Sequence, residues 1–271
     1  MPIIVLTKKN LLIGLAALAL LAGGAYLFIR FRNKPSAPET ASVMAPVENY
    51  ELNVLPLKNR ALPVYAVGRE DKRIALTIDA AWDADKTPFI LDTLDKYNVK
   101  ATFFLCGVWV KQYPDCVKEI ARRGHEIGNH TQNHLRLSDQ TPKTIIREIT
   151  QVSQALWNNH HYVTHLLRPP YGGRNAKVNS VIRYLGYEVI MWGQTGKDAT
   201  AGWTGDAIRK LLIKETQPGD IILLHNGANT MHVYLKPVIE EFLSRGWTFG
   251  TVSELMGWDW TDAPLPEGVG D

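Results

Sequence analysis

The sequence contains little cysteine and little excess charge. Only two cysteines, Cys106 and Cys116, occur in 271 residues, which excludes a framework held by several disulfides. A single bridge and two small buried apolar residues remain as alternatives, and the frequent burial of free cysteine favours the second. The formal net charge is only +3, and no dense basic run is interleaved with aromatic residues. We therefore predict no nucleic-acid partner.

The sequence also lacks internal repeats, and its one long apolar run covers residues 11–29. As a helix this run would be about 28 Å long at about 1.5 Å per residue, close to the thickness of a bilayer core. A cleavable signal peptide is the alternative, because residues 22–25 are small, but the apolar run continues to Ile29 and favours an uncleaved anchor. Basic residues flank both ends in similar number, so the positive-inside rule leaves the orientation open.

Composition divides the chain into five segments. We predict a cytoplasmic stub over residues 1–10, a transmembrane anchor over 11–29, a flexible linker over 30–61, a main domain over 62–260 and a tail over 261–271. The linker is assigned because its residues are rich in Pro, Ala, Ser and Thr and show no periodicity.

Short apolar strands alternate with amphipathic helices throughout the main domain. A helix is expected to begin with Thr87 as its N-cap and Pro88 as its first residue. Near-continuous apolar strands separated by helices indicate a parallel sheet covered by helices. About seven such units predict an α/β fold, a distorted (β/α) barrel, although the pattern also permits an open doubly wound sheet. The predicted strands cover residues 74–79, 101–105, 126–129, 166–167, 188–192, 221–225 and 247–252.

Polar residues recur where the predicted strands end, which is the edge that holds the active site in a barrel of this kind. These residues are Asp79, His130, His134, Arg168, Asp198 and His225. His130 and His134 are four residues apart in a loop after a strand, a spacing that suits two ligands of one zinc ion. A catalytic zinc site also needs a carboxylate and a water at an open position.

The other strand-end residues suit hydrolysis of an amide. Asp79 is the candidate general base for a metal-bound water, and His225 is the candidate acid that protonates the leaving amine. Asp198 is expected to orient His225, and the prolines after Arg168 are expected to fix its guanidinium against a carboxylate. The backbone N–H of Tyr171 is a candidate oxyanion donor. Trp203 is equally suited to a sugar subsite and to the core.

Five motifs occur in order: TIDAAWDAD (77–85), HTQNH (130–134), RPPY (168–171), a Trp–x5–Asp segment (192–198) and LLH (223–225). Together they resemble the NodB-homology polysaccharide deacetylases, carbohydrate esterase family four, over about residues 62–256. The resemblance implies a divalent metal, usually zinc, and removal of N-acetyl groups from peptidoglycan or chitin-like chains. The resemblance implies that Asp79 is the base, Arg168 the partner of the base, and His130 and His134 the metal ligands. It also implies that His225 is the acid and that Asp198 is the carboxylate that tunes it.

The sequence departs from that family at two positions. The family's first motif usually reads Thr-Phe-Asp-Asp-Gly, and its second Asp binds the metal, whereas this chain has Ala80 there. Asp85 is the favoured substitute ligand, with Asp83 as the alternative. Gly193 stands where acidic residues are common in the family.

These observations predict a single-pass membrane protein whose hydrolase domain is extracytoplasmic and acts on an amino-sugar polymer of the cell wall. A tethered domain suits a polymer fixed near the membrane, such as peptidoglycan. The alternative from another class is a deacetylase-like wall-binding protein that has lost catalysis together with the metal Asp. A hydrolase of small amides is a third reading.

Overall fold

The computed structural model describes residues 62–261, 263–266 and 269. The predicted stub, anchor and linker lie outside these residues. Within the described part of the chain, no helix is long and apolar enough to cross a membrane. Eight strands are described there: β1 (Arg73–Ala80), β2 (Thr102–Leu105), β3 (Glu126–Asn129), β4 (Leu166–Leu167), β5 (Glu188–Val189), β6 (Gln194–Thr195), β7 (Ile221–His225) and β8 (Thr248–Gly250).

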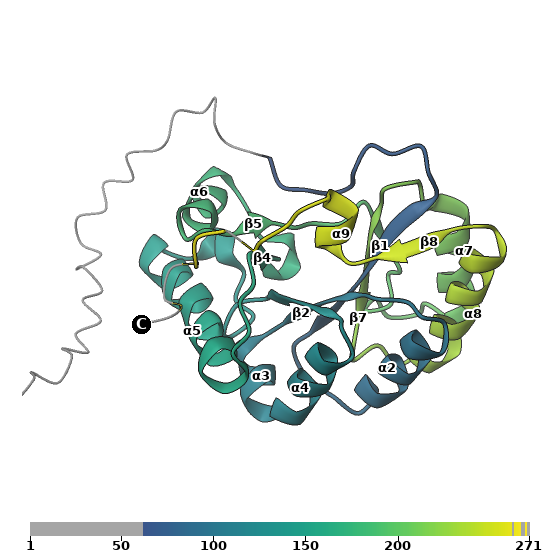
Figure 1. The fold of residues 1–271 in the computed structure, drawn as a ribbon, viewed down its shortest axis with the longest axis horizontal. Helices are drawn as coiled ribbons and strands as arrows, with labels where there is room; N and C mark the ends of the chain where they lie inside the picture. Colours follow the sequence, from purple (N-terminus) through teal and green to yellow (C-terminus); the bar gives the residue numbers. More distant parts are fainter. Residues whose placement is uncertain (1–61, 262, 267–268, 270–271) are drawn as a thin grey trace, which may run out of the picture. The chain divides into compact units, whose positions relative to one another are not determined.

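The strands form one parallel sheet in the order β5-β4-β3-β2-β1-β7-β6, with β8 paired to β1. The segment before β1 pairs with two other parts of the sheet. Val64 forms a bridge to Ile190, which follows β5, and Ala66 forms a bridge to Asp220, which precedes β7. The result is a parallel half-barrel (Figure 1). The predicted α/β class and the parallel arrangement are confirmed, and the barrel is open rather than fully closed.

Helices connect the strands, as parallel pairing requires. Figure 1 shows α2, α3, α4 and α5 in a row along one side of the sheet, and α7 beside α8 near its far edge. The α-helices are α2 (Thr87–Lys96), α3 (Gly107–Gln112), α4 (Pro114–Arg122), α5 (Pro142–His160), α6 (Ala176–Tyr184), α7 (Gly205–Glu215), α8 (Met231–Ser244) and α9 (Val252–Met256), and two 3-10 turns are η3 (Leu137–Asp139) and η4 (Pro170–Gly172).

β1 is the central strand and is buried on both faces. Ile74, Leu76 and Ile78 point into the larger core between the sheet and its helices. Ala75 points to the opposite face, into a smaller core that includes residues of α9. Because side chains alternate along a strand, Thr77 and Asp79 share the face of Ala75. The strand therefore delivers Asp79 to the inner face of the half-barrel.

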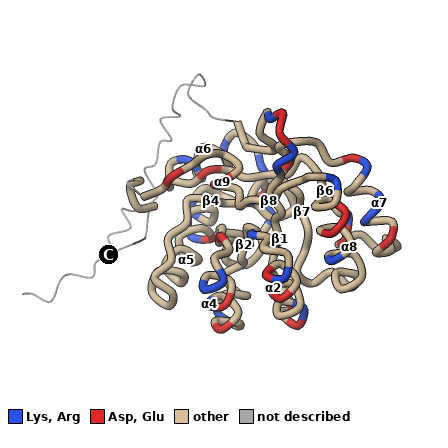
Figure 2. Tube along the Cα trace, turned by 45° about the vertical axis from the view of Figure 1, so that its right-hand side comes forward, with Lys and Arg blue, Asp and Glu red and all other residues tan. Residues whose placement is uncertain are grey.

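Charged residues concentrate on the helices and loops. Figure 2 shows Lys, Arg, Asp and Glu alternating along the outer helices α2, α4, α7 and α8. Arg123, which follows α4, joins that helix to α2 through Asp92 at 2.7 Å and Asp95 at 3.0 Å. Such exposed pairs contribute little to stability, so the apolar core carries the fold.

Three local expectations need correction. Lys86, not Thr87, is the N-cap of α2, because Thr87 is buried and its hydroxyl donates to Asn226 Oδ1 at 3.0 Å. Both cysteines are free thiols, so the single-bridge alternative is wrong; burial raises the pKa of Cys106 to about 11. The predicted strand over 188–192 ends at Val189.

Candidate active site

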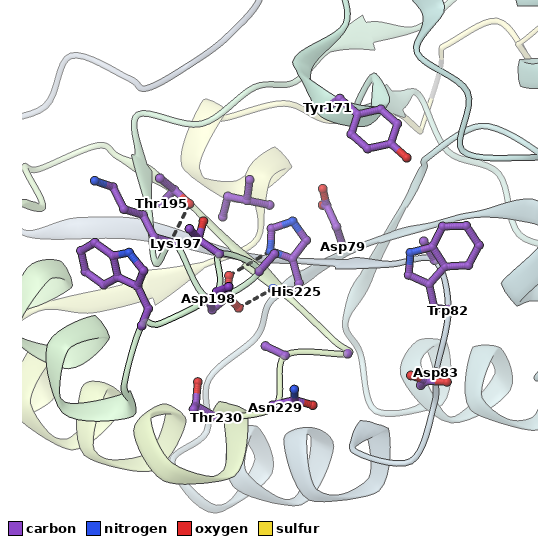
Figure 3. A pocket seen from close by; sticks show the side chains of 18 of the residues that line it. Asp79, Trp82, Asp83, Tyr171, Thr195, Lys197, Asp198, His225, Asn229 and Thr230 are labelled. Atoms are coloured by element: carbon purple, nitrogen blue, oxygen red, sulfur yellow. Dashed lines mark hydrogen bonds and ion pairs between the residues drawn. The ribbon is translucent and has the colours of Figure 1, made fainter.

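A cleft of about 890 Å³ lies at the carboxyl ends of the strands. Asp79 comes from the end of β1, and His225 from the end of β7, directly opposite it in the strand register. His130 and His134 come from the loop after β3. All four line the cleft, together with Asp198 and Tyr171. The structure therefore brings the predicted strand-end residues to one place, and Figure 3 shows Asp79, Asp198 and His225 of this group.

Asp79 is held by a fully buried guanidinium. Arg168 donates from Nη1 to Asp79 Oδ1 at 2.8 Å and to the hydroxyl of Thr77 at 2.7 Å. Its Nη2 donates to the carbonyl of Met191 at 2.8 Å. The guanidinium also lies 4.1 Å from the ring centroid of Phe104. These contacts fix Arg168 in one orientation, in which Nη1 faces the carboxylate of Asp79.

The surroundings of Asp79 favour its ionised form. Burial alone would raise the pKa of this carboxyl, but the charge of Arg168 holds the pKa below its usual value of 3.8. Oδ2 remains on the cleft side, 3.4 Å from His130 Nε2. A carboxylate that stays ionised and faces a cleft is suited to accept a proton from a bound water.

The two histidines are neighbours in a loop and not on a helix. Their ring centroids are 5.0 Å apart, and both Thr131 and His134 have positive φ angles, of 65° and 57°. His130 donates from Nδ1 to the carbonyl of Arg168 at 2.7 Å, which leaves Nε2 as a lone-pair donor facing Asp79. His134 Nδ1 is buried without a hydrogen-bond partner among the described residues.

A buried carboxylate on α5 holds this loop, and the sequence analysis missed it. Glu148 accepts from the backbone N–H of Asn133 at 2.8 Å and from its side-chain amide at 2.7 Å. Glu148 is fully buried, and its own carbonyl accepts from the N–H of Gln132 at 2.8 Å. A signal was present in the sequence, because Glu148 interrupts the apolar stripe formed by Ile145, Ile149 and Val152.

The imidazoles of His130 and His134 are suited to be two ligands of a divalent metal such as zinc. Burial lowers the pKa of His130, and it lowers that of His134 to about 4, so both rings are neutral at pH 7, the form that binds a metal. The unpartnered Nδ1 of His134 and the unprotonated Nε2 of His130 are available to coordinate a metal ion. The described residues contain no ready-made group of three or more His, Cys, Asp or Glu side chains placed to hold a metal ion.

The positions considered for a third ligand are separate from this pair. Ala80 packs in the larger core and offers no donor. Asp83 lines the cleft, and Figure 3 shows it well below Asp79. Asp85 is exposed and pairs with Lys86 at 3.0 Å. Asp83 and Asp85 therefore remain predictions for a metal-loaded protein.

Packing explains why position 193 is a glycine. A Cβ at this position would come within 2.3 Å of Asp220 Oδ1 and 3.2 Å of the carbonyl oxygen of Tyr65. Asp220 is itself engaged, since it accepts from the N–H of Gln217 at 2.8 Å. A side chain, and an acidic one above all, does not fit here unless Asp220 moves.

His225 is oriented by Asp198, as predicted. The carboxylate of Asp198 accepts from His225 Nδ1 at 2.9 Å and from the His225 backbone N–H at 2.8 Å. Tyr234, on α8, donates its hydroxyl to the same carboxylate at 2.7 Å; the sequence offered no motif for this contact. Burial would lower the pKa of His225, but the bond to Asp198 raises it above the usual 6.5. His225 Nε2 can therefore carry a proton at neutral pH.

Aromatic side chains line the cleft around these groups. The His134 ring is 4.6 Å from the ring of Tyr171 and 5.6 Å from that of Trp82. Trp82 is 62% exposed and Tyr171 58%, and the guanidinium of Arg136 lies over the Tyr171 ring, 4.8 Å from its centroid. Trp203 lines the cleft and also packs against the larger core, so both readings of this residue fit the structure. Tyr171 adopts a φ of 57° in the RPPY turn.

Known proteins resemble this chain in sequence. The profile of the polysaccharide deacetylase family matches residues 66–190. A peptidoglycan-N-acetylglucosamine deacetylase of Listeria monocytogenes is 33% identical over 227 residues, 82% of this chain but 48% of its own length, so the chain spans about half of that relative. A peptidoglycan-N-acetylmuramic acid deacetylase of Bacillus subtilis is 31% identical over 250 residues, 89% of this chain and 93% of its own.

Solved structures agree with the fold. A CE4 family pseudoenzyme from Bacillus anthracis matches with a TM-score of 0.69 and 27% identity, over 72% of this chain and 69% of its own. The match to the Bacillus subtilis protein covers nearly all of that relative, and the motif residues of this chain meet in one cleft. The chain therefore belongs to the polysaccharide deacetylase family, carbohydrate esterase family four.

Proposed function

We propose that this protein is a metal-dependent hydrolase that removes N-acetyl groups from an amino-sugar polymer, with peptidoglycan as the main candidate and chitin-like oligomers as the second. One observation carries the proposal. An ionised carboxylate, Asp79, and a proton-bearing imidazole, His225, face the same cleft from adjacent strands, next to two neutral histidines. Pairs of groups whose surroundings push their pKa values apart mark the base and the acid of a site.

The residues divide the hydrolysis into two proton transfers. Asp79 accepts a proton as a water oxygen forms a bond to the amide carbonyl carbon. His225 then donates its proton to the nitrogen as the carbon–nitrogen bond breaks, which releases acetate and a free amine. A metal held by His130 and His134 would supply Lewis-acid activation of water and carbonyl. The backbone N–H of Tyr171 is the proposed donor to the developing oxyanion.

We also propose that residues 11–29 anchor the protein and that the domain lies outside the cytoplasm. The support is the uncharged apolar run of bilayer length and the location of the proposed polymer. The linker over 30–61 would let the domain reach glycan strands near the membrane.

The deciding experiment measures acetate release by the full chain from peptidoglycan and from chitin oligomers, with and without added zinc. We expect zinc-dependent release, with peptidoglycan the better substrate. Absence of acetate from both polymers under zinc saturation would refute the enzymatic proposal.

A wall-binding protein without catalysis is the second candidate. Ala80 in place of a metal-binding Asp favours it, and the solved relative named a pseudoenzyme belongs to the same family. Binding of peptidoglycan without acetate release would support this candidate. Retention of both proton-transfer pairs favours the enzyme.

The two histidines provide a separate test of the metal. We expect His130→Ala and His134→Ala each to lose stoichiometric zinc or cobalt, because even the loss of outer partners weakens affinity about 10–100-fold. His232→Ala is the matched control, since His232 does not line the cleft. Elemental analysis of the purified proteins is the measurement, and unchanged metal content in both variants would contradict the assignment.

A further inference from the structure

Lys197 is the one Lys or Arg among the described residues that line the cleft. Of the other charged groups in the cleft, Asp79 pairs with Arg168 and Asp198 with His225, whereas Asp83 forms no ion pair among the described residues. Lys197 is exposed, and its ammonium lies 5.0 Å from the ring centroid of Trp203. No ion pair to Lys197 occurs within the described part of the chain. The cleft therefore presents one unneutralised ammonium over an indole.

Hydrogen bonds fix the backbone conformation at Lys197. Lys197 has a φ of 54°, a left-handed conformation that residues other than glycine rarely adopt. Thr195 Oγ1 accepts from the Lys197 N–H at 3.2 Å, and the Lys197 carbonyl accepts from Thr200 at 2.9 Å. The next residue, Asp198, is anchored to His225. The backbone of Lys197 therefore has a fixed position relative to His225, the candidate acid.

The two sides of the cleft differ in chemistry. Figure 3 shows Tyr171 and Trp82 on one side of the Asp79–His225 pair and Lys197 on the other. The first side offers the exposed indole of Trp82 and the ring of Tyr171, which has the Arg136 guanidinium 4.8 Å from its centroid. Aromatic faces suit the apolar face of a sugar ring. The second side offers an indole with an ammonium beside it, which suits a sugar ring that carries a negative charge.

We propose that Lys197 and Trp203 form a subsite for a sugar bearing a carboxylate substituent, adjacent to the sugar that loses its N-acetyl group. The inference rests on the proposed function and narrows its substrate class. A glycan in which carboxylate-bearing sugars alternate with neutral ones would place a charge beside Lys197 whenever a neutral sugar occupies the catalytic position. A neutral chitin-like chain would leave the ammonium without a partner.

The test compares three oligomers of equal length on the full-length chain: a peptidoglycan glycan with free sugar carboxylates, the same glycan with those carboxylates methyl-esterified, and a chitin oligomer. The readout is the ratio of kcat/KM for the free glycan to that for the ester. We expect Lys197→Gln to lower this ratio about three- to fivefold, the range of an exposed ion pair, and Lys197→Arg to keep most of it. Lys143→Gln, an exposed lysine on α5, is the matched control.

The salt dependence of this ratio provides a second test of the subsite. The preference of the parent protein for the free carboxylate should shrink between low salt and 1 M salt, where the Debye length falls to about 3 Å. The ratio of Lys197→Gln should stay nearly constant over the same range. An equal ratio for parent, Lys197→Gln and Lys143→Gln would overturn the proposal.

Failure of the proposed function is distinguishable from failure of this subsite. If no oligomer yields acetate, the enzymatic proposal falls, and calorimetric binding of the free and esterified glycans replaces the kinetic ratio. A binding preference that disappears in Lys197→Gln would still support the subsite. Equal binding of both glycans by the parent protein would refute it.

Discussion

Asp79 and His225 stand opposite each other on β1 and β7, yet their neighbours push their protonation states apart. Arg168 keeps Asp79 ionised despite its burial, and Asp198 keeps a proton on His225 despite its burial. Arg168 and Asp198 are the main charged partners, and the charges of Asp79 and His225 also favour each other's ionised forms. The division of labour between base and acid therefore depends on two contacts that single substitutions can remove.

Asp79→Asn should reduce kcat about 10²–10⁴-fold, because an amide cannot accept the water proton. The buried guanidinium of Arg168 would lose its counter-charge, and removing one partner of a buried pair costs about 3–5 kcal/mol of stability. Bound metal should remain, since His130 and His134 are unchanged. Acetate release, urea unfolding and elemental analysis measure the three effects.

Asp71→Asn is the control for this variant, because Asp71 forms an exposed pair with Arg69 far from the cleft residues. It should retain parental activity. Undiminished turnover in Asp79→Asn would exclude Asp79 as the base.

Asp198→Asn should move the alkaline limb of the pH–rate profile to lower pH. In the parent, activity should fall as pH rises through the pKa of His225, which lies above 6.5. Without the carboxylate, burial is the dominant effect left, and it lowers the pKa of His225. The acid limb, set by Asp79 below 3.8, should stay in place. The measurement is kcat/KM against pH.

Tyr234→Phe serves as the comparison, because it removes a hydrogen bond to Asp198 but keeps the carboxylate. Its alkaline limb should stay above that of Asp198→Asn. Coincident limbs for the parent and Asp198→Asn would show that another group acts as the acid.

At the scale of elements, the strands supply the proposed base and acid, whereas a loop supplies the proposed metal ligands. The loop after β3 has two residues with positive φ, so its conformation needs support from outside. α5 provides this support through Glu148. A helix that contributes no side chain to the cleft lining thus positions the histidine pair.

Glu148→Gln should weaken zinc affinity about 10–100-fold, as expected for partners that orient ligands. A glutamine keeps the size of the side chain but replaces one of the two acceptor oxygens, each of which accepts one N–H of Asn133, with a donor. Glu126→Gln is the matched control, because Glu126 is a largely buried carboxylate that bonds to Thr102 and Ser253 and does not line the cleft. Zinc titration and thermal unfolding separate ligand positioning from general destabilisation. Equal zinc affinities in the two variants would contradict the role.

At the scale of the whole molecule, the proposed anchor decides where the domain works. We expect the mature protein to keep residues 1–29 and to sediment with membranes, because the apolar run matches a bilayer core. Protease added outside intact cells should remove the domain. N-terminal sequencing provides the check, and a soluble secreted form beginning near Ala25 or Tyr26 would refute the anchor.

The sequence by itself determined the strand–helix alternation and the edge of the sheet that carries the site. Both depend on local periodicity: β1 and β7 read as apolar runs that end at Asp79 and His225, and parallel strands bring such ends together. The order of the motifs was sufficient for the family. The predicted helix start at Pro88 was one residue late, because the hydroxyl of Thr87 bonds to a distant partner, Asn226, and Thr87 is the first helical residue.

Only the tertiary structure decided which atoms make the contacts that tune these groups. Arg168 and Asp79 are 89 residues apart, and Tyr234 and Asp198 are 36 apart, so no local pattern pairs them; the family resemblance implied the first pair and gave no indication of the second. Glu148, Trp82 and Lys197 likewise gained their places from packing between elements. The physical reason is that periodicity reports which face of an element is buried, whereas hydrogen bonds and charge pairs depend on the positions of atoms from several elements at once.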